Sequence, residues 1–494
     1  MKKSLSLIVA GLLSITCLEH AEAQQTYTRY EAHTPQGQKA LASMRKAITV
    51  MKEKGCKDPI SWYYQGAMHW TPDVSFGTYL EQNPLCPSYT KSSPALSAGW
   101  DNCASHNSTG PSSGIHFLPW HRMYLIYFES IIREVSGDSK FAIPYWNYGS
   151  NYIMPKEFQA TDGGSLYEES RRISLNKGKP IDDVAKVKIL AYLRNLNQTH
   201  DYETFNDQLN QGLHGFMHDY IGGQDGTFNP IYNTVVNDEV DPGCGKGCGM
   251  MAEVPSAGFD PIFWLHHSNI DRLYQKYLIS NPNITLEQLE SVKWPYNFFK
   301  IKKTSSDFTS TEVNLSMSDV LNNISSINYQ YDDQPKLKAA EEAKAKAPLL
   351  HESVLVSTEP KIEVKHNKPA KLHISARTEL KPMLLETSKS RLILEVTASY
   401  KESSKGHYDV FVGLPADIEP TSKQALENYF VGTISFFVND PQVKGGTHTF
   451  RYDITDELAA AKIDSDSFDI SVVKTYGPEK GIVTIDKVTV QTLK

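Results

Sequence analysis

Residues 259–272 read FDPIFWLHHSNIDR, and the adjacent histidines His266 and His267 in this stretch decide how the rest of the chain is interpreted. If the stretch is helical, both histidines lie beside apolar side chains, and the period alone does not choose between them. Burying two imidazoles in such surroundings is costly unless their nitrogens find partners. A metal ion can supply one partner, and Asn269, Asp271 or backbone carbonyls can supply others.

His214 and His218 form a second pair, in the stretch LHGFMHD. A spacing of four residues puts both imidazoles on one helix face, one turn apart, so that the rings can converge on one ion. An apolar stripe on the same stretch indicates that this face is turned inward. Taken alone, the spacing is also compatible with two structural histidines at the edge of a helix.

A third candidate helix covers residues 116–135, which read HFLPWHRMYLIYFESIIREV. His121 lies one turn before its broad apolar stripe and on the same face. His116 begins the stretch, and His106 and His69 lie upstream. Each lone histidine has a structural explanation, but all of them together indicate a metal centre. Imidazole-rich sites suit zinc, copper, iron or nickel, so the spacing alone does not select the metal.

The composition is that of an ordinary globular protein, with 494 residues, 40% hydrophobic and 22% charged, enough for two or more domains. A net charge of -7 provides no basic surface for nucleic acid. Residues 1–23 have the order of a secretory signal peptide, because Lys2 and Lys3 precede an apolar run and Ala-Glu-Ala at 21–23 offers a cleavage site. We therefore expect a soluble protein without a membrane anchor that begins near Gln24 and is periplasmic or secreted.

Five cysteines follow the expected signal peptide, and an odd number leaves at least one thiol free or engaged in other chemistry. They are Cys56, Cys86, Cys103, Cys244 and Cys248. We favour a loop-closing disulfide between Cys244 and Cys248 over a metal site, because no second Cys-x3-Cys pair completes a zinc site.

Three segments are expected after the signal peptide: a helical domain over 24–335, a linker over 336–350 and a β-rich domain over 351–494. The helical period is clear from Leu41 to Met51. The linker contains the charged stretch KLKAAEEAKAKA. In the last segment the period changes to two, and short alternating strands predict a β-sandwich-like domain. The expected strands contain Leu392, Leu394 and Val396; Val410 and Val412; Ile434, Phe436 and Val438; Phe450, Tyr452 and Ile454; Ile470 and Val472; and Val483 and Ile485.

These motifs resemble those of the tyrosinase and catechol oxidase (polyphenol oxidase) family. FLPWHRMYL at 117–125, with Glu129, resembles the first copper motif, and DPIFWLHHSNIDR at 260–272 is similar to the second almost letter for letter. The resemblance covers roughly residues 40–335, ending near Tyr329-Gln-Tyr331, and 351–494 is similar to the C-terminal domain of polyphenol oxidases. It implies a mainly α domain with a four-helix-bundle core that holds two copper ions, a type-3 pair.

Carried over residue by residue, the resemblance implies that the second copper is held by His214, His218 and His267. His266 would then lie outside the ligand set, with Asn269 and Asp271 supporting the helix. The first copper would take His121 and His69.

The middle ligand of the first copper is where the sequence departs from the family pattern. The family places it nine residues before the FLPWHR histidine, and Ser112 stands there. His106 and His116 are the alternatives, and we favour His106 because it follows a cysteine, as the family ligand often does, with an insertion before the motif. Some relatives link a cysteine to a first-copper histidine, but a disulfide of Cys103 fits at least as well.

The resemblance implies an enzyme that uses dioxygen to oxidise o-diphenols to o-quinones, and it leaves open whether the enzyme also hydroxylates monophenols. In the family an Asn after the first histidine of the H-x3-H pair helps to hold a water, and Gly215 in its place favours diphenol oxidation. Val254 resembles a residue at the mouth of the active site, where its small size would admit bulky phenols.

Two other function classes remain possible at this stage. A haemocyanin-like oxygen carrier would share the copper site, and a zinc hydrolase would need an H-E-x-x-H arrangement that is absent. The C-terminal domain is expected to act either as a lid, as in plant relatives, or as a permanently docked stabilising domain.

Overall fold

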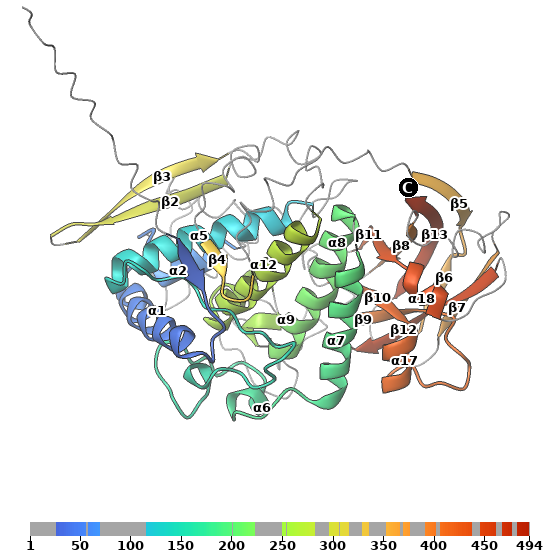
Figure 1. Ribbon diagram of the computed structural model, residues 1–494, viewed down its shortest axis with the longest axis horizontal. Coiled ribbons are helices and arrows are strands. Elements are labelled where there is room, and N and C mark those ends of the chain that lie inside the picture. Colours follow the sequence, from blue (N-terminus) through green and yellow to red (C-terminus); the bar gives the residue numbers. More distant parts are fainter. Residues whose placement is uncertain are drawn as a thin grey trace, which may run out of the picture.

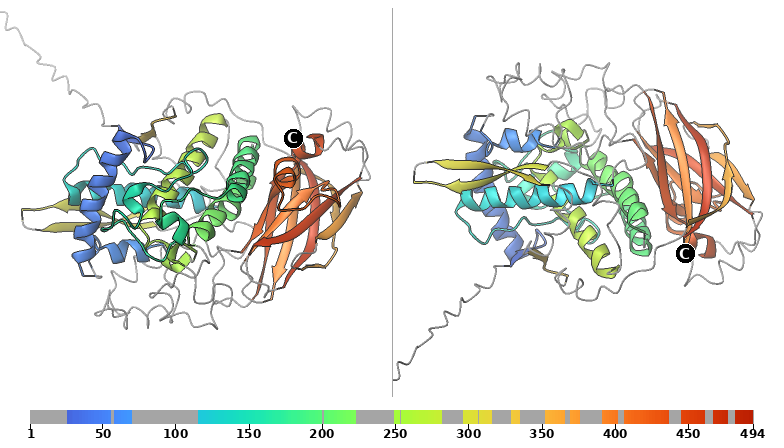
Figure 2. Two further views of the ribbon diagram at one scale, coloured as in Figure 1. Left: turned by 90° about the horizontal axis from the view of Figure 1, so that it is seen from below. Right: turned by 90° about the horizontal axis from the view of Figure 1, so that it is seen from above.

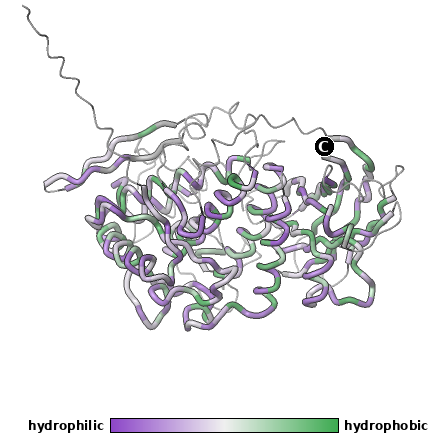
Figure 3. Tube along the Cα trace, viewed as in Figure 1, coloured by the Kyte–Doolittle hydropathy of each residue, from purple (hydrophilic) through white to green (hydrophobic). Residues whose placement is uncertain are grey.

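A computed structural model gives the fold, which has helices at one end and strands at the other (Figure 1). Both ends contain buried apolar side chains, and among the described residues no helix is long and apolar enough to span a bilayer. Hydrophobic residues recur in both parts of the molecule (Figure 3). The structure describes residues 26–55, 58–69, 115–199, 201–222, 249–252, 254–281, 296–305, 307–315, 329–334, 352–365, 369–375, 391–401, 406–436, 445–460, 467–476 and 482–493.

The helical part is built from long helices that carry buried apolar faces and from short connecting turns. The elements are α1 (Pro35–Glu53), α2 (Trp62–Ala67), α5 (Phe117–Ser136), η2 (Lys156–Phe158), α6 (Ile173–Asn176), α7 (Asp183–Gln198), α8 (Tyr202–Asp207), η3 (Gln208–His214), α9 (Gly215–Gly222), η5 (Met250–Ala252), α11 (Val254–Ala257) and α12 (Ile262–Ser280).

Helix α1 confirms the predicted period, because its residues from Leu41 to Met51 that recur at helical spacing are buried. The Thr34 side chain accepts a hydrogen bond from the Gly37 amide and caps the helix, with a proline in its first turn. The helix ends at Glu53, just before the predicted stop at Gly55.

The strands of the C-terminal part form two antiparallel sheets, in the orders β10-β9-β12-β7 and β11-β8-β13-β5, with β6 on β13. One cluster of buried side chains draws on both sheets, as the sequence predicts for a sandwich-like domain. The strands are β5 (Glu352–Thr358), β6 (Ile362–Val364), β7 (Ala370–Ser375), β8 (Arg391–Tyr400), β9 (His407–Val412), β10 (Phe430–Ser435), β11 (Gly446–Asp453), β12 (Ser467–Tyr476) and β13 (Val483–Leu493), with short helices α17 (Lys423–Asn428) and α18 (Thr455–Ala460).

Strands β9 and β10 are buried along their whole length, although the period of two predicts one buried face. Tyr408, Val410 and Val412 belong to the core of the sheets, whereas Phe411 and Phe430 belong to the core of the helical part. The second face of this sheet is therefore covered by the helical part, and Figure 2 shows the strands standing directly beside the helices.

Four strands lie in the part that the sequence predicts as helical. Strands β2 (Tyr296–Lys303) and β3 (Phe308–Leu315) form an antiparallel hairpin. Strands β1 (Tyr27–Arg29) and β4 (Tyr329–Tyr331) pair in parallel. This pairing joins the beginning and the end of the segment 24–335 that the sequence predicts as helical. The four-helix-bundle core and the domain boundaries stay predictions.

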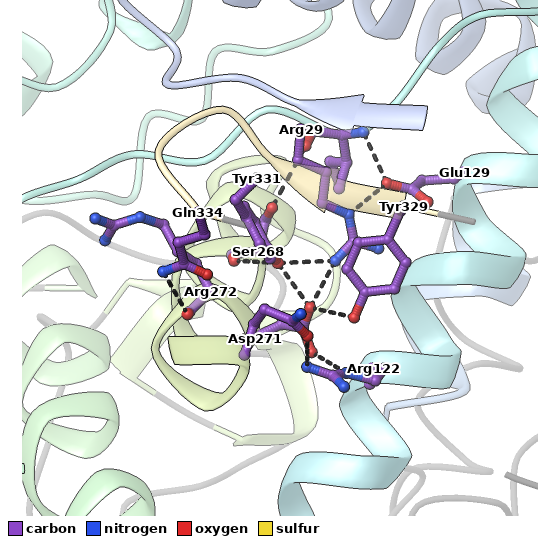
Figure 4. Close-up of polar contacts among 11 residues, drawn as sticks. Arg29, Arg122, Glu129, Ser268, Asp271, Arg272, Tyr329, Tyr331 and Gln334 are labelled. Carbon is purple, nitrogen blue, oxygen red and sulfur yellow. Dashed lines mark hydrogen bonds and ion pairs between the residues drawn. The ribbon is translucent and has the colours of Figure 1, made fainter. Parts of the chain in front are cut away.

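A buried carboxylate at Asp271 ties the β1–β4 pair to two helices (Figure 4). It accepts hydrogen bonds from Arg122 Nε on α5 (2.5 Å), Arg29 Nη1 on β1 (2.8 Å), and the hydroxyls of Tyr329 (2.8 Å) and Tyr331 (2.6 Å) on β4. Burial by itself would raise the pKa of the Asp271 carboxyl, but the two guanidinium charges and these hydrogen bonds leave that pKa below its usual value.

We expect the Asp271→Asn substitution to lower the free energy of unfolding by about 3–5 kcal/mol, because it removes the carboxylate that pairs with the buried Arg122 and leaves the buried Arg29 with Glu129 alone. Urea denaturation of the full chain measures the loss. Asp333→Asn is the matched control, since Asp333 pairs with Arg272 at a half-exposed site, and it should cost under about 1 kcal/mol. Equal losses in the two variants would contradict the assignment.

The same comparison has a pH dependence with a defined sign. Because the folded-state pKa of Asp271 is depressed, its stabilising contribution is present above roughly pH 4 and is lost as the pH falls through the folded pKa. The difference between wild type and Asp271→Asn should therefore narrow at acidic pH.

Candidate metal centre

Six buried histidines converge inside the helical part, from four separate segments of the chain. They form two groups that share His267, and within each group the candidate ligand atoms lie within 4.8 Å of one another. One group contains His214, His218, His266 and His267, and the other contains His69, His121 and His267.

Backbone carbonyls fix the orientation of four of these rings. Since a carbonyl oxygen only accepts, each Nδ1 must be the donor, and the lone pair is then on Nε2. The four bonds are His69 to Val254 O (3.0 Å), His121 to Phe117 O (2.8 Å), His214 to Asn210 O (3.0 Å) and His218 to Met251 O (2.7 Å). Four imidazoles are thus held in the tautomer that presents Nε2 to a metal ion.

His267 lies between the two groups and is the strongest sign that the site suits a metal. Its ring stacks on that of His121, with centroids 4.2 Å apart, and lies 5.0 Å from that of His214. Both its ring nitrogens are buried without a hydrogen-bond partner in the described part of the chain. Such a buried polar atom is costly, and a bound ion would satisfy it.

His266 differs from its neighbour. Its Nδ1 lies 3.4 Å from the Tyr148 hydroxyl, a long contact, and its Nε2 is buried with no partner among the described residues. The ring lies 4.8 Å from that of His218. Both His266 and His267 therefore lie at the centre. The sequence period had not decided which of the two would do so.

Burial favours the uncharged form of five of these imidazoles. Loss of hydration lowers the pKa of His69 and of His266 to about 3, and it lowers the pKa of His121, His218 and His267 well below the ordinary value. A metal ligand must be the neutral imidazole, so the environment presents the required form at physiological pH.

Two local features of the backbone place the rings. The helical run from α8 to α9 passes through the π-helical turn η3, at whose end His214 lies, and such turns are frequent at functional sites. His69 follows α2, where Gly66 packs backbone to backbone on Gly258: a Cβ on Gly258 would lie 2.6 Å from the Gly66 carbonyl oxygen. Only glycine allows this approach.

The two candidates for the middle ligand of the first copper have different outcomes. His116 is buried at the N-terminal end of α5 and belongs to neither histidine group. His106 lies outside the described residues, as do all the cysteines, the linker at 336–350 and residues 1–23.

The other predicted residues surround the centre. Gly215 begins α9 next to His214, and Val254 is buried, with its carbonyl oxygen 3.0 Å from His69 Nδ1. Asn269 Oδ1 accepts a hydrogen bond from Arg272 (3.2 Å), and Asp271 supports α12 as described above.

Sequence reasoning missed the groups that orient the ring nitrogens. The carbonyls of Val254 and Met251 carry no side-chain signal, so no pattern could have found them. Arg122 had such a signal, because it directly follows His121 within the quoted motif and its guanidinium reaches Asp271 on α12.

The model of the common central domain of tyrosinase matches residues 59–183 and 167–279 of this chain. Tyrosinase HcTyr1 of Hahella sp. (strain CCB-MM4) is 27% identical over 465 residues, which cover 85% of this chain and 88% of that protein. Chloroplastic polyphenol oxidase E of Solanum lycopersicum is 26% identical over 216 residues, but this match spans only 36% of the tomato protein.

Two solved structures share the fold at low sequence identity. The latent aurone synthase (polyphenol oxidase) superposes with a TM-score of 0.64 at 17% identity, over 95% of this chain and 91% of that one. The latent apple tyrosinase superposes with a TM-score of 0.63 at 19% identity, over 95% and 98%. The chain thus contains a match to the common central domain of tyrosinase, is similar over most of its length to the Hahella tyrosinase, and shares the fold of these two solved structures.

Proposed function

We propose that the histidine centre holds two copper ions. His214, His218 and His267 would hold the second copper, and His69, His121 and His106 the first. The observation that carries the proposal is that two groups of buried imidazoles share His267. Both ring nitrogens of His267 are buried and have no hydrogen-bond partner among the described residues. An all-imidazole donor set suits copper, and the names of the relatives favour it over zinc.

In this proposal the helices α2, α5, α9 and α12 form the four-helix-bundle core, and His69 directly follows α2. His266 would lie beside the second copper without being its ligand, oriented by the Tyr148 hydroxyl. Asp271 and Asn269 would hold α12 in place from behind, and His116 would lie beside the centre without being a ligand. Residues 24–335 and 351–494 would form the two domains.

The proposed reaction is the oxidation of o-diphenols by dioxygen to o-quinones. Bound copper supplies the electron transfer between phenol and oxygen. The chain's own side chains hold the imidazoles and exclude water: Phe263 lies 4.2 Å from the His267 ring, and Phe117 lies 4.6 Å from both the His121 and His214 rings. Such apolar packing keeps the centre dry, which strengthens electrostatic interactions inside it.

The preference for diphenols rests on Gly215, which offers no side chain to hold a water beside the second copper. Val254 would lie near the substrate. It is buried, and its carbonyl oxygen contacts the His69 ring. The protein would be exported by its signal peptide. Its C-terminal domain would act as a lid on the centre. The alternative is a haemocyanin-like protein that binds oxygen without turnover.

We expect His267→Ala to lower the copper content from about two ions per chain to about one or fewer, because it removes the ring shared by both groups. Elemental analysis of the copper-loaded, desalted protein gives the ratio. His373→Ala is the control, since His373 is exposed on the C-terminal sheet and should leave the ratio unchanged. Two retained coppers in His267→Ala would rule out this ligand set.

The choice between His106 and His116 has a separate test. His106→Ala should retain about one copper per chain, whereas His116→Ala should retain about two, because only His106 is proposed as a ligand. Retention of two coppers after His106→Ala would overturn the choice.

Gly215 predicts a substrate preference. The copper-loaded protein should oxidise catechols much faster than it hydroxylates tyrosine, and Gly215→Asn should raise the hydroxylation rate relative to the oxidation rate. A panel of monophenols and diphenols, followed by quinone absorbance, measures both. Lag-free hydroxylation of tyrosine by wild type contradicts the preference, and the absence of turnover on either class favours the oxygen-binding alternative.

A further inference from the structure

Asp219, on the outer surface of α9, contacts the C-terminal sheet and directly follows the proposed copper ligand His218. His407, the first residue of β9, places its Nε2 2.5 Å from Oδ2 of Asp219, which is next to His218 in the chain. The His407 side chain is fully buried, and that of Asp219 is 17% exposed. The contact therefore lies inside the interface between the two parts of the molecule.

The same imidazole also contacts the turn between the two ligands. The ring of Phe216, which lies between His214 and His218 in sequence, packs edge-on against the His407 ring with centroids 5.8 Å apart. His407 thus contacts the outer face of the one helical turn whose inner face carries both histidines. A side chain on β9 is in position to set how far this turn is rotated about the helix axis.

On the opposite side, α9 is held by contacts within the helical part. The His218 ring donates to the Met251 carbonyl, and the Gly222 carbonyl accepts from the Gly249 amide (3.1 Å). These two contacts hold the inner face and the C-terminal end of α9. The His407–Asp219 bond holds the outer face, so α9 is fixed between two sets of partners.

Docking of the two parts does not depend on this contact, because other bonds join them at α7. Lys188 pairs with Asp409 (2.8 Å), the Tyr192 hydroxyl bonds to that of Thr433 (2.6 Å), and Arg194 donates to the carbonyl of Glu427 (2.7 Å). None of these bonds is made to α9, although Lys188 Nζ and the Tyr192 ring pack against the Phe216 ring of α9, at 5.1 and 5.8 Å from its centroid. His407 is therefore the polar contact through which the described C-terminal sheet reaches the helix that carries His218.

We propose that His407 is a positioning residue for the second copper, an inference that rests on the proposed dicopper centre. The C-terminal sheet then contributes to the metal centre itself as well as covering one side of the helical part. His407 does not contact the ion. It acts by fixing Asp219 and Phe216, and through them the directions of the His214 ring at the end of η3 and the His218 ring on α9.

The test compares His407→Phe and His407→Gln in the full-length, copper-loaded protein. His407→Phe keeps a ring against Phe216 but removes the hydrogen bond, and His407→Gln keeps a donor that can reach the carboxylate. Titration with a copper chelator should remove one of the two coppers from His407→Phe at about tenfold lower chelator concentration than from wild type, and His407→Gln should recover most of this loss.

Arg194→Met is the matched control, because it removes an interdomain hydrogen bond from α7 and leaves α9 untouched. It should give the chelator curve of wild type. A shift in Arg194→Met equal to that in His407→Phe would reduce His407 to a docking contact and overturn the proposal, as would a wild-type curve for His407→Phe.

Asp219→Ala approaches the contact from the other side and keeps the test decisive if His407→Phe does not fold. It should shift the curve by a similar factor, and the double variant with His407→Phe should shift it no further than Asp219→Ala alone, since both substitutions remove the same bond. Additive shifts would overturn the proposal. If the wild type itself does not bind two coppers, the proposed centre fails, which is a separate outcome.

Discussion

The carboxylate of Asp271 is the interaction on which the arrangement of the helical part depends. It brings together a guanidinium from α5, another from β1 and two hydroxyls from β4, all in the interior. Arg122 is the neighbour of His121, and Asp271 lies one helical turn after His267, so their ion pair fixes the relative height of the two helices. The close stacking of the His121 and His267 rings follows from that register.

A second constraint is the absence of charge on the ligands. No carboxylate or thiolate enters either histidine group in the described part of the chain, so a bound cation would meet only neutral dipoles. Electron density on the imidazoles is therefore governed by the carbonyls that accept from their Nδ1 atoms.

Much of the fold and of the candidate site could be predicted from the sequence because local periodicity reports burial. The helix at Leu41–Met51, the alternating strands and the inward faces carrying His121, His214 and His218 all follow from it. The period could not tell what buries the second face of β9, where His407 and Asp409 look like solvent-facing residues. Nor could it choose between His266 and His267, because both occupy buried positions on α12.

The buried pair of Lys188 and Asp409 has a consequence for assembly accuracy. Its attraction is offset by the water that both ions lose, so it adds little to the strength of the interface. A sheet seated one residue out of register would, however, separate the ammonium of Lys188 from the Asp409 carboxylate that it pairs with. The hydroxyls of Thr433 and Thr475, which donate to the same carboxylate, make the correct seating still more selective. The ion pair thus contributes to the specificity of docking, because it disfavours a misaligned arrangement of the C-terminal sheet on the helical part.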